Sequence, residues 1–236
     1  MLLDSGRSRK RDVGLFMIVR GAVDLSLRGI GGRLDHLAEL GQWDVFGESR
    51  LLTGRVAPMV ASARTEVEVL ALPEAFVLSE LTEELPGFME MLRDTYHSRL
   101  KDTLFIHHPL LRPLEPEIRG RLRVKALPAG GVAVTQGAPC DGLYVILRGR
   151  MIATASGQIV ASLQAGDLFN GDALTMDAPA SAVTVQATGE EVALLQIDRE
   201  ALGFISASQP SVVESLVEHL LALQPSYGRH GIIRTV

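Results

Sequence analysis

Short apolar runs alternate with polar positions in both halves of the chain, and Gly and Pro residues separate the runs. In the first half, this alternation predicts strands at 15–19, 23–27, 60–63 and 67–72. Short strands with regular turn signals are typical of antiparallel sandwiches and barrels. The sequence therefore predicts a mainly β protein.

A helical period follows the strands in each half. From Pro86 to Phe105, apolar residues recur at three- and four-residue spacing, and Pro stands at the start, where its missing N–H is tolerated. The expected apolar stripe consists of Phe88, Met91, Leu92, Tyr96 and Leu100. A second helix is predicted at 211–223, with Val213, Leu216 and Leu220 apolar, and a shorter helix at 114–122.

The two halves of the chain resemble each other. Three pairs of segments match in the same order: Gly14–Gly21 with Gly142–Gly149, Leu40–Phe46 with Leu163–Phe169, and Glu66–Leu72 with Glu191–Ile197. Ordered matches of this kind indicate a repeated structural unit. We therefore expect two domains, residues 1–107 and 108–236, with one fold used twice.

The first copy is expected to be incomplete. Residues 111–141 precede the first shared strand of the second copy, whereas only residues 1–13 precede that of the first. The first copy should therefore lack a leading helix and one or two strands. Because an unpaired sheet edge is a liability, three explanations stay open: a short strand starting at Leu2 and Leu3, a partner that covers the edge, or a truncated chain.

Composition and charge narrow the functional classes. The chain has 236 residues, 47% of them hydrophobic, and a net charge of −5, which argues against broad nucleic-acid binding. Its one cysteine, Cys140, allows no intramolecular disulfide and favours a cytoplasmic setting. No apolar run approaches the roughly 20 residues that span a bilayer, and the start does not have the order of a secretory signal. Small molecules or proteins are the expected partners.

Candidate chemistry is sparse. His97, His107 and His108 have no carboxylate or thiol at ligand spacing, so we expect no metal site. No catalytic Ser/His/Asp order or phosphate-binding glycine loop is present, so a non-enzymatic protein is predicted. Trp43 stands where the second copy has Gly166. We expect its ring to pack over the first barrel, although a stacking platform for a ligand ring is the alternative.

Both halves resemble cyclic-nucleotide-binding domains, the jelly-roll modules of catabolite-activator-type regulators, kinase regulatory subunits and nucleotide-gated channels. Residues 134–149 and 163–169 carry this resemblance in the second copy, and in the first copy it begins at Gly14. The resemblance implies a mainly β fold with flanking α-helices: two tandem jelly-roll barrels, the first N-terminally incomplete. It also implies a regulatory function in signal transduction.

The resemblance places a phosphate-binding cassette at residues 46–60, FGESRLLTGRVAPMV. In the family, backbone N–H groups hold the anion, the Glu accepts from the ribose 2′-hydroxyl, and an Arg further along pairs with the cyclic phosphate. Here the Arg position falls on an alanine followed by Pro58, while an arginine two residues earlier could reach back. The candidate ligand-binding residues are Phe46, Gly47, Glu48, Leu51, Arg55 and Ala57.

The second cassette, which starts at Phe169, departs further from the family pattern. It is expected to carry one extra residue, to replace Glu with Asp, and to have a serine or alanine at the Arg position. Residues 167–198 contain no Lys or Arg, so an anion there would meet net negative charge. The candidate residues of this weaker site are Gly171, Asp172, Ala173, Ser181 and Ala182.

Two functions follow from these patterns. In the first, the protein senses a nucleotide or related small molecule, weakly or in an unusual way. A hydrogen bond to a charged group contributes about 1.5 to 3 kcal/mol, so loss of the Arg weakens binding tens- to hundredfold. In the second, the domains are a scaffold without a ligand, and the C-terminal helix of each domain contacts a protein partner or another copy. No cofactor is expected beyond a weakly bound cyclic nucleotide, and residues 224–236 are too short for a DNA-binding module.

Overall fold

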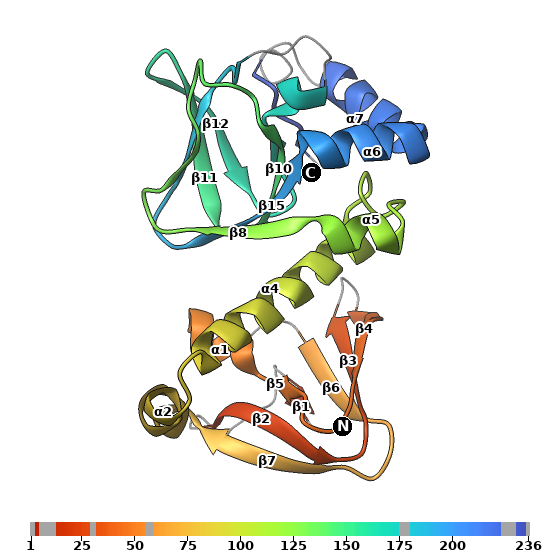
Figure 1. The fold of residues 1–236 in the computed structure, drawn as a ribbon, viewed down its shortest axis with the longest axis vertical. Helices are drawn as coiled ribbons and strands as arrows, with labels where there is room; N and C mark the ends of the chain where they lie inside the picture. The colour runs from red at the N-terminus through yellow and green to blue at the C-terminus, as the bar shows by residue number, and fades with distance from the viewer. Residues whose placement is uncertain are drawn as a thin grey trace. The chain divides into compact units, whose positions relative to one another are not determined.

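The structure, a computed structural model, describes residues 3–4, 13–28, 32–54, 59–174, 180–222 and 230–234. The chain forms two compact units, Met1–Ile106 and His107–Val236, coloured red to yellow and green to blue in Figure 1. Some residues used in the predictions lie outside the described residues. They are Leu2 of the short strand, Arg55, Ala57 and Pro58 of the first cassette, and Leu223 of the C-terminal helix.

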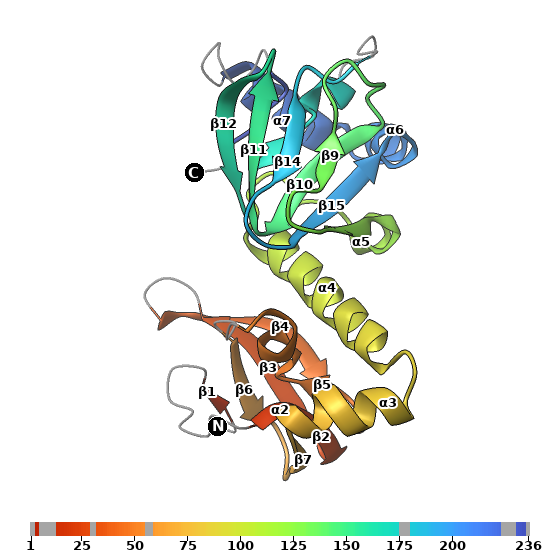
Figure 2. The same cartoon turned by 90° about the vertical axis from the view of Figure 1, so that its left-hand side faces the viewer.

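The second unit contains two four-stranded antiparallel sheets, with strand orders β13-β10-β15-β8 and β12-β11-β14-β9. Figure 2 shows the neighbouring strands β11, β14 and β9 of the second sheet. The sheets form a jelly-roll sandwich rather than a closed barrel. The strands are β8 (Arg123–Leu127), β9 (Val132–Val134), β10 (Gly142–Arg148), β11 (Arg150–Ala155), β12 (Gln158–Gln164), β13 (Leu168–Phe169), β14 (Thr184–Ala187) and β15 (Val192–Asp198).

The core of the second unit lies between its two sheets. Strand β10 is apolar along most of its length, and six of its seven residues are buried. Tyr144 of this strand pairs with Phe169 of β13, and their rings stack with centroids 5.2 Å apart. Packing of branched aliphatic and aromatic side chains from both sheets provides the main driving force for this fold.

Helices of the second unit cover one end of the sandwich. They are α5 (Pro116–Arg121), the 3-10 turn η3 (Gly171–Leu174), α6 (Arg199–Ser208) and α7 (Pro210–Ala222). The side chain of Asp198 accepts a hydrogen bond from the backbone N–H of Ala201 and so caps the start of α6. Leu216 and Leu220 of α7 are buried, as the helical period predicted, and α6 and α7 lie side by side in Figure 1.

The described part of the first unit repeats the same strand order with one strand fewer. Its sheets have the orders β1-β6-β3-β4 and β5-β2-β7. The strands are β1 (Leu3–Asp4), β2 (Val13–Arg20), β3 (Val23–Arg28), β4 (Leu34–Leu40), β5 (Val45–Phe46), β6 (Met59–Ala63) and β7 (Glu68–Pro73). The helical elements are α1 (Glu48–Thr53), α2 (Glu74–Phe76), η2 (Val77–Leu81), α3 (Thr82–Glu84) and α4 (Phe88–His107).

The missing strand of the first unit can be identified by its position. Strand β1 pairs with β6, as β9 pairs with β14 in the second unit. Strand β7 corresponds to β15, but no described strand takes the place of β8 at its outer edge. Within the described residues, the first unit therefore lacks the strand at this edge, and the predicted short strand exists at Leu3–Asp4 but pairs with β6.

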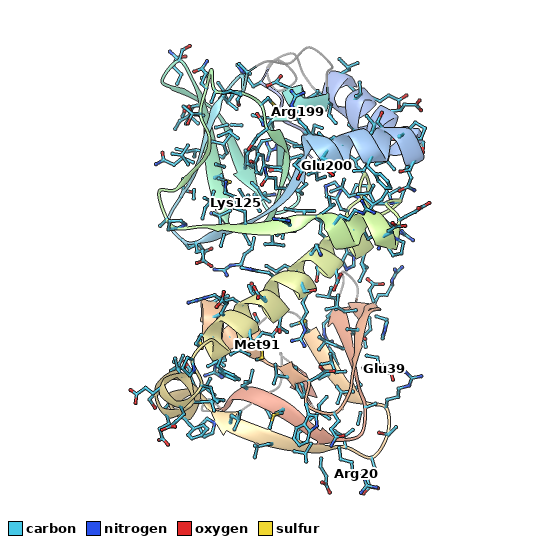
Figure 3. All side chains as sticks on the ribbon, in the orientation of Figure 1. Arg20, Glu39, Met91, Lys125, Arg199 and Glu200 are labelled. Atoms are coloured by element: carbon cyan, nitrogen blue, oxygen red, sulfur yellow. The ribbon has the colours of Figure 1, made fainter. Side chains whose placement is uncertain are left out.

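Helix α4 buries most of the predicted face, with Met91 as the exception. Leu92 and Tyr96 are buried as expected, but Met91, labelled in Figure 3, is 43% exposed. Arg99 is buried in its place, at 8% exposed. Residues 92, 96 and 99 follow an i, i+4, i+7 spacing and share one face of the helix. The prediction was wrong at Met91 because it grouped residues by hydrophobicity and left out a buried arginine.

Candidate functional site

The first cassette is shaped by a left-handed glycine. Strand β5 ends at Phe46, and Gly47 follows with φ 96° before helix α1 begins. A Cβ at Gly47 would lie 3.3 Å from the carbonyl oxygen of Gly14. Glycine adopts this conformation without the steric cost that other residues incur. The turn therefore directs the next residue, Glu48, toward the interior of the unit.

Glu48 forms a buried ion pair with helix α4. The carboxylate is fully buried, and its Oε2 accepts a hydrogen bond of 2.5 Å from Nη1 of Arg99. Nη2 of the same guanidinium donates to the carbonyl oxygen of Val45, at 2.6 Å. The other carboxylate oxygen, Oε1, has no hydrogen-bond partner among the described residues. A buried acceptor without a donor is costly, so this oxygen is positioned to receive a hydroxyl or N–H group.

Two other predicted residues of this cassette have packing contacts. Phe46 is 2% exposed, and its ring stacks on Phe16 with centroids 5.2 Å apart. Leu51 packs against the buried cluster around Leu15 and Leu92. These contacts hold the cassette in place.

The second cassette has a different register from the one predicted. Asn170 has φ 64°, and its carbonyl oxygen accepts from the N–H of Ala173, as that of Gly47 accepts from Arg50. The side-chain amide Nδ2 of Asn170 donates to the carbonyl oxygen of Gly142, at 2.6 Å. Asn170 therefore corresponds to Gly47. The predicted extra residue before the turn is absent.

Glycine thus occupies the position of Glu48 in the second cassette. Gly171 corresponds to Glu48, and Asp172 corresponds to the residue after it. The interpretation of Asp172 as a shortened replacement for Glu was wrong, because the left-handed residue sets the register and Asn tolerates that conformation. The second cassette lacks any side chain at the ribose-facing position of the family.

The remaining candidates of the second cassette contact one another. Oδ2 of Asp172 accepts from the backbone N–H of Ala182, at 3.2 Å. The hydroxyl of Ser181 is buried and donates to the carbonyl oxygen of Val183, at 2.9 Å. The structure therefore brings Asp172, Ser181 and Ala182 together, but their hydrogen bonds are made within the chain.

The C-terminal segment His230–Arg234 lies against the second cassette. This contact was not predicted from the sequence. The carbonyl oxygen of Gly231 accepts from the N–H of Gly171, at 2.7 Å. Ile233 exchanges two backbone hydrogen bonds with Leu168, at 2.9 and 3.0 Å. Ile232 and Ile233 are fully buried. No sequence pattern places this C-terminal segment on a turn about sixty residues away, so only the structure reveals this contact.

A cavity of about 280 Å³ lies beside the second cassette, between η3, α6 and α7. Among the predicted residues, Ala173 lines it. Arg199, labelled in Figure 3 at the start of α6, also lines it, and its Nε donates to the carbonyl oxygen of Cys140. Burial raises the pKa of the Cys140 thiol, which fits an inert packed cysteine.

Trp43 does not pack as expected. It has φ 71°, and the corresponding residue of the second unit, Gly166, has φ 92°. The indole is 63% exposed, because this left-handed turn places its side chain at the surface. The expectation of a packed ring over the first barrel was wrong.

The imidazole of His108 forms hydrogen bonds with the backbone of the second unit. Its Nδ1 accepts from the backbone N–H groups of Leu110 and Leu111, and its Nε2 lies 3.0 Å from the carbonyl oxygen of Gly166. Burial lowers the pKa of His108, while the Gly166 hydrogen bond and Asp167 oppose that shift. Among the described residues, no cluster of His, Cys, Asp or Glu could hold a metal ion.

Residues 124–208 match the model of the cyclic nucleotide-binding domain family. The resemblance to cyclic-nucleotide-binding domains is confirmed. The chain is also 25% identical over 193 residues to a cAMP-dependent protein kinase regulatory subunit of Dictyostelium discoideum. That match covers 78% of this chain and 57% of the relative, so the chain spans little more than half of that protein.

Solved structures with a similar fold include two kinase regulatory proteins. The regulatory domain of Toxoplasma gondii PKA with cAMP is 23% identical, with a TM-score of 0.40, over 88% of this chain and 79% of that chain. The regulatory subunit of a cAMP-independent protein kinase A from Trypanosoma brucei is 17% identical, with a TM-score of 0.45, over 92% and 76%. Within the described part of the chain, no helix has the length and hydrophobicity needed to cross a membrane.

Proposed function

We propose that the protein is a non-catalytic cytoplasmic regulator whose first unit binds a nucleotide or a related small molecule through the cassette at residues 46–60. The supporting observation is the carboxylate of Glu48, which is fully buried with Oε1 unpartnered among the described residues. A ligand hydroxyl donated to Oε1 would satisfy this acceptor. The family match of the second unit and the shared strand order of both units support this function.

The ion pair between Glu48 and Arg99 connects the first cassette to helix α4. Arg99 belongs to α4, the long helix that follows the sandwich, and it also donates to the cassette strand at Val45. A ligand that binds Glu48 changes the electrostatics of the pair that holds α4. Binding and helix position are then linked through one shared interaction, as a two-state regulator requires.

Calorimetry of the full chain with cAMP, cGMP and cyclic dinucleotides tests this function. We expect weak saturable binding, strengthened at least about tenfold in Ala57→Arg, which supplies a charged partner for the phosphate. Gln158→Arg adds the same charge at an exposed position of β12 in the second unit and should leave binding unchanged. Ser181→Arg tests the second cassette in the same way. If the wild-type chain stays silent while Ala57→Arg binds, the first cassette is a vacated site and the proposed function is wrong.

A scaffold without a ligand is the second candidate function. Leu78 in η2, Leu85 in the turn between α3 and α4, and Met91 in α4 are each more than 40% exposed. Exposed apolar side chains on neighbouring helices are typical of a protein-binding surface. Sedimentation of the full chain over a hundredfold concentration range, with Leu85→Ser as the comparison, measures self-association through these side chains. Concentration-independent mass in both proteins would contradict self-association as its role.

A further inference from the structure

The residues His230–Arg234 contact the second cassette as a ligand contacts a site. Three backbone hydrogen bonds join the two segments, one between Gly171 and Gly231 and two between Leu168 and Ile233. The segment adds to the free edge of β13, whose other edge pairs with β10. The pairing is an isolated antiparallel bridge between Leu168 and Ile233, and pairing of a peptide backbone with a sheet edge is a general mode of peptide recognition.

We propose that the second cassette is a peptide-binding site, occupied in this chain by its own residues 231–234, for a segment of the form Gly-Ile-Ile-Arg that turns at Gly231 (φ 62°) and pairs with β13 at Ile233. Main-chain pairing along β13 provides affinity, and the side chains provide specificity. This site differs from a nucleotide site, because the backbone N–H of Gly171 is already used by a carbonyl oxygen.

The glycine positions make the site selective for Gly231. A Cβ at Gly231 would lie 2.9 Å from both the backbone nitrogen of Gly171 and Oδ2 of Asp172. A Cβ at Gly171 would in turn lie 2.9 Å from the carbonyl oxygen of Gly231 and 3.1 Å from Leu220. The two backbones approach so closely that only glycine fits on each side.

The side chains after Gly231 fit two different environments. Ile232 belongs to the apolar core cluster between the sheets, and Ile233 is also fully buried. Nε of Arg234 lies 4.0 Å from Oδ2 of Asp167, a carboxylate that is fully buried. Because residues 168–198 contain no Lys or Arg, this part of the cassette provides no cation for Asp167. An arginine at the end of the bound segment supplies the charge that a buried carboxylate requires.

Covalent linkage keeps the site filled in the intact chain. A segment that belongs to the same chain as its site has an effective concentration on the order of millimolar. An added peptide therefore competes poorly against the chain's own segment. Removal of residues 230–236 should free the site, and this makes exchange measurable.

The test uses the heptapeptide of residues 230–236, labelled with a fluorophore, and a chain shortened to residues 1–229. Fluorescence anisotropy should show saturable binding to the shortened chain and none to the full chain. The same peptide carrying Gly231→Val should bind at least about tenfold more weakly, because the added side chain overpacks the contact with Gly171. A folded shortened chain that binds no peptide, or equal binding by both chains, would overturn the proposal.

If the shortened chain does not fold, amide hydrogen exchange of full-length variants tests the proposal instead. In full-length Gly231→Val, the amides of Leu168, Gly171 and Ile233 should exchange faster together, while the amides that pair β10 with β15 keep their protection. Gly157→Val provides the control, because Gly157 also has a positive φ, of 80°, but no atom within 4 Å of an added Cβ. Equal loss of protection in the β10 ladder would show that the segment is inseparable from the core and would overturn the proposal.

Discussion

The two cassettes have the same frame but different contacts at one position. Each begins with a stacked aromatic pair, with ring centroids 5.2 Å apart, followed by a residue with left-handed φ. In the first unit the next residue is Glu48, paired with Arg99 of the following helix. In the second unit it is Gly171, packed against Gly231 and Leu220. One turn geometry therefore accommodates a buried ion pair in one unit and a close backbone contact in the other.

The largest expected effect comes from breaking the ion pair of the first unit. Arg99→Leu leaves the carboxylate of Glu48 buried without its partner, which costs about 3 to 5 kcal/mol in free energy of unfolding. Urea denaturation followed by fluorescence of Trp43, the one tryptophan of the sequence, measures this loss in the first unit. Arg93→Leu on the exposed face of α4 should change stability by less than about 0.5 kcal/mol. Equal effects of the two variants would show that the pair does not stabilise the unit.

The glycine contact of the second unit should give the next largest effect. Gly171→Ala places a methyl group against Gly231 and Leu220, and overpacking of this kind costs about 1 to 3 kcal/mol. Thermal unfolding followed by circular dichroism measures the change. Gly120→Ala in α5 meets open space and should be neutral or slightly stabilising. If Gly171→Ala behaves like Gly120→Ala, the close approach of the two backbones is not important for stability.

A pH effect should distinguish the second unit from the first. Because burial lowers the pKa of His108, the unfolded chain binds a proton more readily than the folded chain. The free energy of unfolding should therefore fall as pH decreases below about 6.5, by at most about 1.4 kcal/mol per pH unit. His108→Asn should remove this slope, whereas the exposed His36→Asn in the first unit should not. Urea denaturation at pH 7.5, 6.5 and 5.5 measures it, and parallel slopes for wild type and His108→Asn would contradict this expectation.

The smallest expected effect is at the left-handed residue itself. Asn170→Gly relieves about 1 to 2 kcal/mol of backbone strain but removes the hydrogen bond to Gly142, which contributes about 0.5 to 1.5 kcal/mol. The net change should therefore stay within about 1 kcal/mol. Gly47→Asn in the first unit should be clearly destabilising, because its Cβ meets the carbonyl oxygen of Gly14. Chemical denaturation of both variants provides the comparison, and a similar loss in both would contradict it.

The sequence predicted the features that repeat locally and missed those that join distant segments. The period-two pattern and the internal repeat predicted strands in both units, because the alternation of apolar and polar side chains can be recognised from neighbouring residues. The pair of Glu48 and Arg99 joins residues 51 positions apart, and a buried arginine on an apolar face leaves no periodic signal. Asn170 was a signal that could have been used, since Asn is among the residues that tolerate left-handed φ.

The open edge of β7 has a consequence for how the molecule comes apart. Among the described residues, β7 pairs with β2 alone, and Leu70 at its middle is 47% exposed. Local unfolding starts where few contacts hold the backbone, so limited proteolysis should cut the first unit at this strand before it cuts the second. Glu68 and Pro73 at the two ends of β7 are residue types that discourage pairing with another chain. This edge strand therefore carries, at its two ends, residue types that oppose aggregation.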